Sequence, residues 1–149
     1  MKVWVQRVDR ASVSVAGETV GAIGRGYLVL FGVAKGDAPE AAARLARRIC
    51  SLRIFDDADG KTNLSIGDVG GSVLAVSQFT LYADTRHGNR PGFSAAARPE
   101  EAEPLYRRFV DELRGILGEG RVATGIVRAE MKVELVNDGP FSVELLDEP

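Results

Sequence analysis

Apolar and polar residues alternate, or form short β-branched runs, through the first quarter of the chain. These runs cover residues 2–8, 11–15, 19–23 and 27–33, with glycines between them or inside them. Alternation with a period of two is typical of a strand that buries one face. The pattern therefore predicts four successive strands.

Two later segments have the three- and four-residue spacing of an amphipathic helix. In the first, the apolar positions are Ala42, Leu45, Ala46, Ile49 and Leu52. Asp37 is the expected N-cap and Pro39 lies in the first turn, which predicts a helix of about four turns. The second helix opens at Glu100, and glycines 115, 118 and 120 close it. Its apolar face consists of Leu105, Phe109, Leu113 and Leu117.

Further strands are expected at 53–55, 72–80, 122–124, 130–136 and 141–146, with residues 137–140 interrupting the last two. Residues 82–99 are rich in Gly, Arg and Pro and predict a loop. Residues 56–60 are acidic, but calcium-loop spacing would place Phe55 and Ile66 at ligand positions, so a turn is expected. This order of elements predicts one α+β domain over residues 1–149, with much antiparallel pairing.

The composition excludes several classes of protein and several kinds of site. The chain is 45% hydrophobic and 27% charged, which excludes a disordered protein, and its net charge of -2 excludes a global positive field. Cys50 and His87 are the only residues of their types, so intramolecular disulfides and multi-cysteine metal sites are excluded, and any Ser/His/Asp triad would need His87. Arg44, Arg47 and Arg48 are expected on a solvated helix face.

Targeting signals are not evident in this sequence. The first ten residues carry charges rather than an apolar run, and the longest apolar stretch is far shorter than the roughly twenty residues of a membrane helix. We therefore expect a cytoplasmic protein with no membrane partner.

Two segments place polar residues at the ends of apolar strands. They are Ser77-Gln78-Phe79-Thr80-Leu81 and Asn137-Asp138-Gly139-Pro140-Phe141-Ser142. A strand end holds hydroxyls and backbone N–H groups in fixed directions, which suits orientation of an ester carbonyl and stabilisation of its oxyanion. Spacing alone also fits pleat-compatible residues and an ordinary Gly-Pro turn.

These two segments resemble the signature motifs of the D-aminoacyl-tRNA deacylase family, Ser-Gln-Phe-Thr-Leu and Asn-x-Gly-Pro-Val-Thr. The resemblance covers almost the whole chain. The other matching segments are Gln6-Arg7-Val8, Arg10-Ala11-Ser12-Val13, Gly32-Val33, Lys35-Gly36-Asp37, Leu52-Arg53-Ile54-Phe55, Asn63-Leu64-Ser65, Asp68-Val69-Gly70-Gly71, Leu81-Tyr82-Ala83-Asp84, Arg90-Pro91 and Ala129-Glu130-Met131.

The resemblance implies a mostly antiparallel, barrel-like twisted sheet with two main helices. It implies hydrolysis of the ester that joins a D-amino acid, or glycine, to the 3′-terminal adenosine of tRNA, with rejection of L-aminoacyl-tRNA. It also implies a homodimer whose active sites lie across the subunit interface, and it implies no metal and no organic cofactor.

Roles for individual residues follow from the same resemblance. Ser77, Gln78 and Thr80 match the catalytic motif; since Thr80 has no base nearby in sequence, we expect it and Gln78 to position the substrate. The N–H groups around Phe79 and Thr80 would face the oxyanion, with the 2′-hydroxyl of the RNA helping to activate water. Residues expected to bind the substrate are Phe79, Met131, Asn137, Gly139 and Pro140.

Gly139 and Pro140 match the family's chirality filter, a cis Gly–Pro peptide that projects carbonyl oxygens into the partner's pocket. A rigid backbone wall near the substrate Cα admits hydrogen or a D side chain and excludes an L side chain. This exclusion also allows many different D side chains, because none of them has to be recognised.

For RNA contact we expect Arg7, Arg86 and Arg90, with His87 as a surface residue. The sequence departs from the family at Phe141 and Ser142, which replace Val and Thr, and at Val127-Arg128, which replaces Phe-Gly. Two alternatives stay open: a non-catalytic tRNA-binding module with the same fold, and an esterase or amidase acting on free D-amino-acid derivatives.

Overall fold

One long strand, β1 (Lys2–Val15), organises the sheet in the computed structural model, which describes residues 1–147. β8 (Lys132–Leu146) pairs with β1 along one side. On the other side β3 (Gly26–Gly32) pairs with the first half of β1 and β2 (Glu18–Ile23) with the second, and all three pairings are antiparallel. β6 (Ser72–Ser77) and β7 (Val122–Thr124) extend the sheet in parallel. The expected α+β fold with a mostly antiparallel sheet is confirmed.

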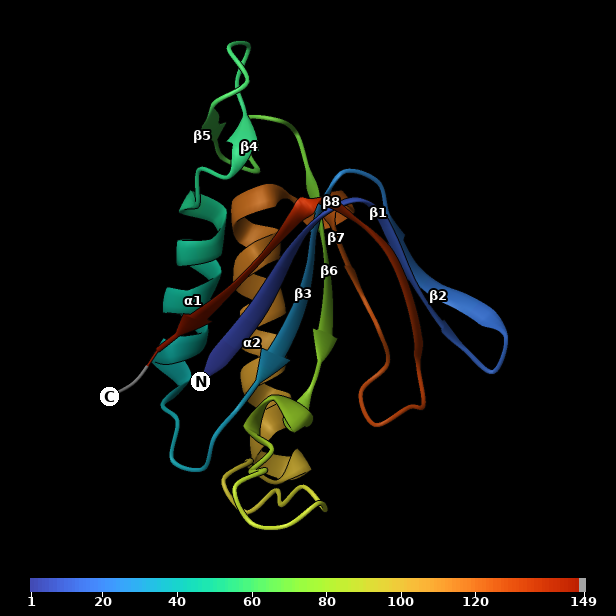
Figure 1. Ribbon diagram of the computed structural model, residues 1–149, viewed down its shortest axis with the longest axis vertical. Helices are drawn as coiled ribbons and strands as arrows, with labels where there is room; N and C mark the ends of the chain where they lie inside the picture. Colours follow the sequence, from blue (N-terminus) through green and yellow to red (C-terminus); the bar gives the residue numbers. More distant parts are fainter. Residues whose placement is uncertain (148–149) are drawn as a thin grey trace.

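The sheet curls until its ends almost meet (Figure 1). β2 approaches β7 at Gly21, where an added Cβ would lie 2.5 Å from the carbonyl oxygen of Thr124. Only glycine permits this backbone contact. The nearly closed barrel expected from the family resemblance is therefore present.

Two helices, α1 (Pro39–Ser51) and α2 (Pro99–Leu117), pack side by side and cover one face of the sheet (Figure 1). The main core lies between them and the sheet. Its largest fully buried side chains include Tyr27, Phe31, Phe55 and Phe109, and the Phe31 and Phe109 rings stack with centroids 4.5 Å apart. Such stacking adds to the free energy of burial.

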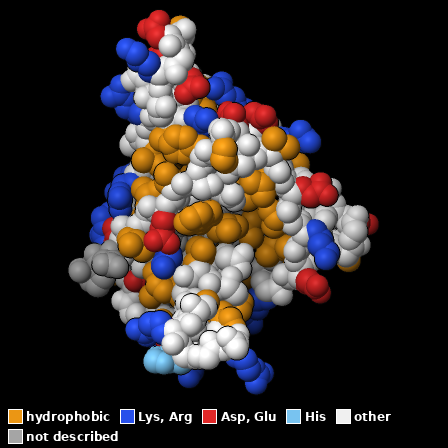
Figure 2. All heavy atoms as spheres, viewed as in Figure 1, with side chains coloured by type: hydrophobic (Ala, Val, Ile, Leu, Met, Phe, Trp, Pro, Cys, Tyr) orange, Lys and Arg blue, Asp and Glu red, His pale blue; other side chains and the backbone are white. Residues whose placement is uncertain are grey.

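A second, smaller core cluster lies on the opposite face of the sheet. It consists of Val8, Ala11, Val13, Leu28, Leu74 and Val76. The apolar residues packed around this cluster are only partly buried, among them Leu30, Val133 and Leu135. In Figure 2 hydrophobic side chains gather on the viewer's side of the molecule, where Figure 1 shows the sheet in front of the helices.

The strand expected over residues 72–80 is shorter than predicted. β6 ends at Ser77, and a 3-10 helix, η1 (Phe79–Tyr82), follows. The last ladder bond on this side runs from the Gln78 N–H to the Phe31 carbonyl, 2.8 Å away. β3 ends at Gly32, so residues beyond Gln78 have no strand to pair with and the chain turns.

The predicted cap of the first helix is wrong. The N-cap residue is Ala38, which makes no side-chain cap bond. Instead, the Asp37 carboxylate accepts the Ala34 N–H at 2.7 Å, which closes the turn before the helix. The two strands predicted for residues 2–15 are the single strand β1, since its partner changes from β3 to β2 without a break.

The remaining short elements follow the expected order. β4 (Phe55–Asp56) and β5 (Thr62–Leu64) form a hairpin, and η2 (Glu119–Arg121) links α2 to β7. The acidic residues between β4 and β5 form the predicted turn, in which Asp57 accepts the N–H groups of Asp59 and Lys61. Gly118, at φ 99°, ends α2.

The basic residues of α1 hold neighbouring elements. Arg44 forms two hydrogen bonds to Asp147, Arg47 binds Glu112 of α2, and Arg48 donates to the Leu146 carbonyl. Cys50, on the same helix, is half-buried, and burial raises the pKa of its thiol to about 11. It packs against the main core as a small apolar residue.

Candidate active site

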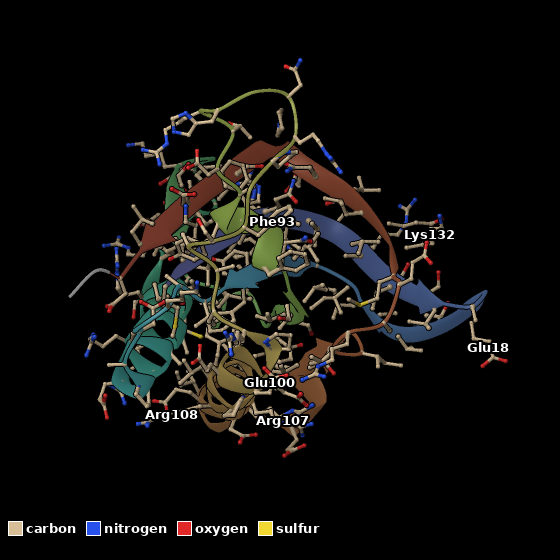
Figure 3. All side chains as sticks on the ribbon, turned by 90° about the horizontal axis from the view of Figure 1, so that it is seen from below. Glu18, Phe93, Glu100, Arg107, Arg108 and Lys132 are labelled. Carbon is tan, nitrogen blue, oxygen red and sulfur yellow. The ribbon has the colours of Figure 1, made fainter. Side chains whose placement is uncertain are left out.

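A pocket of about 690 Å³ opens at the end of the sheet where β6 finishes. Five parts of the chain build its walls: Lys35 after β3; Val76 to Phe79 at and beyond the end of β6; Phe93, Ala96 and Ala97 of the long loop; the start of α2; and residues between 127 and 133, before and within β8. Figure 3 looks at this end of the molecule, with Phe93 over the barrel and Glu100 at the near end of α2.

The first motif enters this pocket because the chain turns there. Ser77, Gln78 and Phe79 line the cavity together with Met131, so the structure brings these four predicted site residues into one pocket. Thr80 does not line it but is adjacent, since the Gln78 side-chain amide donates a hydrogen bond to the Thr80 hydroxyl. The N–H groups of Phe79 and Thr80 lie in the first turn of η1, where no earlier carbonyl of that helix accepts them.

An aromatic pair stands at the mouth of the pocket. Phe79 is 55% exposed and Phe93 is 40% exposed, and their rings meet edge to face with centroids 5.1 Å apart. Exposed aromatic faces of this kind stack readily on nucleobases. The sequence reading missed Phe93, although a phenylalanine in a loop rich in Gly, Arg and Pro was an available signal.

The second motif forms a bulge in the pairing of β1 with β8. Gln6 pairs with Ser142 and Val8 pairs with Asn137, so Arg7 alone faces the four residues 138–141. β8 therefore runs through the predicted interruption as one strand whose ladder opens there. The bulge places Gly139 and Pro140 outside the sheet ladder.

Asn137 closes the bulge from within. Its side-chain oxygen accepts the Phe141 N–H at 2.6 Å, and its amide donates to the Ser142 hydroxyl at 3.0 Å. Serine thus supplies the same hydroxyl as the threonine it replaces. Asn137 holds the segment and does not line the pocket of its own chain.

Arg7 anchors the bulge from below. The residue is only 7% exposed, and its guanidinium donates to the Ile54 carbonyl at 2.5 Å and to the Asp138 carbonyl at 3.0 Å. It also lies over the Phe141 ring, 4.9 Å from the centroid, so the replacement of Val by Phe adds a cation–π contact. Arg7 supports the motif, and its guanidinium is bound by protein atoms.

Gly139 has a backbone that other residues rarely adopt. Its φ is 136°, and an added Cβ would lie 3.0 Å from the Phe141 nitrogen and 3.1 Å from Arg7 Nη2. The Gly139–Pro140 peptide bond is cis, as the family resemblance implies. The glycine at this position is required by both conformation and space.

Within one chain, the two motifs lie at opposite ends of the sheet. η1 lies at the lower end of the sheet in Figure 1, whereas the middle of β8 lies at the upper end. None of Asn137, Gly139 and Pro140 lines the pocket that holds Ser77, Gln78 and Phe79. A single chain therefore does not bring all the predicted site residues together.

The loop proposed for RNA contact is exposed. Arg86 forms two hydrogen bonds to Asp84, and these bonds hold the pKa of that carboxyl at about 2. His87 and Arg90 are also exposed on this loop. The loop thus presents cationic and hydrogen-bonding groups near Phe93.

Arg128 lies on the rim of the pocket in a strained backbone conformation. Its φ is 66°, a region that costs a non-glycine residue about 1–2 kcal/mol. Its side chain lies 3.6 Å from Glu100, but such exposed ion pairs contribute only about 0–1 kcal/mol. The neighbouring Glu103 is hydrogen-bonded to Arg107, which lowers the pKa of that carboxyl, and Arg128 lowers it further.

Possible metal ligands do not gather in the described part of the chain. Residues 1–147 contain no cluster of three His, Cys, Asp or Glu side chains that could hold an ion. In the same residues no helix has the length and apolarity required to cross a membrane. The pocket offers hydroxyl, amide and backbone groups, which suit positioning of an ester and its oxyanion.

Fold and site together define a small α+β barrel protein with one characteristic pocket. Two aromatic rings lie at the mouth of this pocket, and the polar motif at the end of β6 lines it. The chain belongs to the D-Tyr-tRNA(Tyr) deacylase family, whose model matches residues 4–146.

Curated relatives agree with this assignment. A D-aminoacyl-tRNA deacylase from Symbiobacterium thermophilum is 60% identical over 139 residues, which cover 93% of this chain and 91% of the relative. One from Koribacter versatilis is 57% identical over 148 residues, covering 99% and 97%.

Two solved structures share the fold. One, described as a c-Myc DNA unwinding element binding protein, has a TM-score of 0.95 and 41% identity, and the match covers 100% of both chains. The other, described as a probable eukaryotic D-amino acid tRNA deacylase, has a TM-score of 0.81 and 20% identity over 97% of each chain.

Proposed function

We propose that this protein hydrolyses the ester bond of D-aminoacyl-tRNA and of glycyl-tRNA, releasing free amino acid and tRNA, and that it spares L-aminoacyl-tRNA. The observation that carries the proposal is the pocket in which Ser77 and Gln78 lie beside the exposed aromatic pair of Phe79 and Phe93. The reaction is a proofreading step in translation, and we place it in the cytoplasm.

In this proposal the terminal adenosine enters beside Phe79 and Phe93, and the ester carbonyl points toward the first turn of η1. The N–H groups of Phe79 and Thr80 then stabilise the oxyanion, a contribution worth about 10²–10³ in rate per donor. Gln78 and Thr80 orient the ester through their mutual hydrogen bond. The 2′-hydroxyl of the RNA helps to activate the attacking water.

The working enzyme is proposed to be a homodimer in which Gly139 and Pro140 of one copy complete the pocket of the other. Two observations support it. The two motifs lie apart in one chain, and the sheet face opposite the helices has an apolar surface that is only partly buried (Figure 2). A twofold dimer would bury such a surface and create two equivalent shared sites.

The Thr80→Ala variant tests whether Thr80 is a nucleophile. Its hydroxyl accepts a hydrogen bond from the Gln78 amide, and no histidine or lysine among residues 1–147 is hydrogen-bonded to it, so we expect a positioning role. Deacylation of D-tyrosyl-tRNA should fall by roughly tenfold, rather than by the ~10⁴-fold or more expected for loss of a covalent nucleophile. A loss of the larger size, measured in single turnover, would restore Thr80 as nucleophile.

The proposed activity is tested by hydrolysis of D-tyrosyl-, L-tyrosyl- and glycyl-tRNA, with and without a chelator. Turnover of the D and glycyl esters, with the L ester spared and no chelator effect, is the expected result. A protein that binds tRNA but hydrolyses none of the three would be the non-catalytic module instead. A minimal D-tyrosine ester hydrolysed as fast as the tRNA ester would favour the small-molecule esterase.

A further inference from the structure

Arg128 differs from every other described non-glycine residue except Ala16 in having a clearly left-handed backbone. Ala16, at φ 51°, lies with Gly17 in the two-residue turn between β1 and β2, where tight hairpins require positive φ. Arg128, at φ 66°, is the third residue of the turn 126–129, which the hydrogen bond from the Ala129 N–H to the Ile126 carbonyl closes at 3.2 Å. Such a turn accounts for the positive φ, but it favours glycine at this position and so does not explain the arginine.

Interactions within the chain do not account for arginine at this position. Its guanidinium lies 3.6 Å from the Glu100 carboxylate, and the two side chains are 55% and 71% exposed. A loose, exposed pair of this kind contributes little to stability. Glycine would relieve the backbone strain and lose only this exposed pair and the weaker electrostatic interaction with Glu103.

The charges that line the pocket around Arg128 account for an arginine at this position better than its contact with Glu100 does. It lines the pocket together with two other cations, Lys35 and Arg98. The carboxylate among the lining residues belongs to Glu103, which Arg107 binds at 2.7 Å. The mouth of the pocket is thus locally cationic in a chain whose net charge is -2.

We propose that Arg128 binds the phosphodiester that precedes the 3′-terminal nucleotide of the substrate RNA. The proposal rests on the proposed function and assigns a substrate-positioning contact to that same pocket. When the terminal nucleoside lies against Phe79 and Phe93, its 5′ phosphate is left at the mouth. A guanidinium matches two phosphate oxygens with two parallel hydrogen bonds, and Glu100 is then released.

Variants at position 128 separate charge from backbone strain. Arg128→Ala removes the charge and keeps the strain, Arg128→Gly removes both, and Arg128→Lys keeps the charge. The matched control is Arg108→Ala, which removes the same charge from an exposed position of α2 that does not line the pocket (Figure 3).

The first readout is binding of uncharged tRNA, and of a short oligoribonucleotide with the same 3′ end, across a salt series. We expect the Ala and Gly variants to bind both RNAs several-fold more weakly, with a salt dependence reduced by about one phosphate contact. Arg128→Lys should fall between them and the wild type. Only the Gly variant should raise the melting temperature, which a purely structural role of Arg128 would not give.

The second readout is deacylation kinetics on D-tyrosyl-tRNA. Arg128→Gly should raise KM several-fold and leave kcat within about twofold, because the contact is made equally in ground and transition states. If Arg128→Ala and Arg128→Gly both match Arg108→Ala in binding and KM, the phosphate contact is wrong. If the wild type binds RNA through Arg128 but hydrolyses no ester, this contact stands and the proposed function fails.

Discussion

Replacing Gly139 with alanine should reduce deacylation of D-tyrosyl-tRNA by about tenfold or more and bring its rate closer to that of L-tyrosyl-tRNA. The added Cβ would meet the Phe141 nitrogen at 3.0 Å and Arg7 Nη2 at 3.1 Å, at a φ of 136° that L residues rarely adopt. Strain of this kind costs about 1–3 kcal/mol, and relief requires residues 138–141 to move. The wall that excludes L side chains then changes shape.

The measurement compares kcat/KM for the D and L esters in Gly139→Ala and in Gly88→Ala. Gly88 also has positive φ, at 76°, but no atom lies within 4 Å of its added Cβ. This control also places alanine at a positive φ, in an exposed loop, and should keep the D-to-L ratio of the wild type. Equal ratios in both variants would show that the Gly139 segment does not select chirality.

Replacing Arg7 with lysine should lower the free energy of unfolding by about 2–4 kcal/mol and also weaken D-ester selectivity. A single ammonium cannot reproduce the bonds of the guanidinium to both the Ile54 and Asp138 carbonyls. The Asp138 carbonyl belongs to the bulge that carries Gly139. When Arg7 no longer holds the Asp138 carbonyl, the segment that carries Gly139 becomes free to move, and the fold also becomes less stable.

Chemical denaturation of Arg7→Lys beside Arg10→Lys checks this prediction. Arg10 lies on the same strand but is exposed, so the same substitution there should change stability by less than about 0.5 kcal/mol. Indistinguishable unfolding midpoints for the two variants would mean that Arg7 does not anchor the bulge.

The sequence predicted the elements of the fold well where local periodicity decides them. Both helices and the order of the main strands follow from apolar spacing, because each element buries one face. Periodicity could not reveal that β1 is continuous or that β8 continues past Gly139, since both depend on long-range pairing between the ends of the chain. The failure of Asp37 as a cap has the same origin: its carboxylate closes a turn at Ala34 instead.

The site was predictable only in part. The two motifs and Met131 were identified from the family resemblance, and the structure places Ser77, Gln78, Phe79 and Met131 in one pocket. Phe93 was missed because its role depends on the path of an irregular loop. That loop brings the centroid of the Phe93 ring to 5.1 Å from the centroid of the Phe79 ring. The buried position of Arg7 was also hidden, since an arginine on an alternating strand carries no sign of the carbonyls that it will meet.

The central claim is that a D-specific ester-hydrolysing site is assembled from two copies of this chain. Its most direct test uses a purified heterodimer of two variants that are each poorly active as homodimers. One copy carries Phe79→Pro, which removes the proposed oxyanion N–H at a first helical position that tolerates proline, and the other carries Gly139→Ala. Phe79→Ala, which keeps that N–H, is the control for the lost ring.

In such a heterodimer one shared site holds both changes and the other holds neither. The account predicts that D-tyrosyl-tRNA turnover returns to about half of the wild-type rate per dimer, although both parent homodimers are poorly active. A heterodimer no more active than the mean of its parents, or full wild-type activity in a stable monomer, would contradict a site shared between subunits.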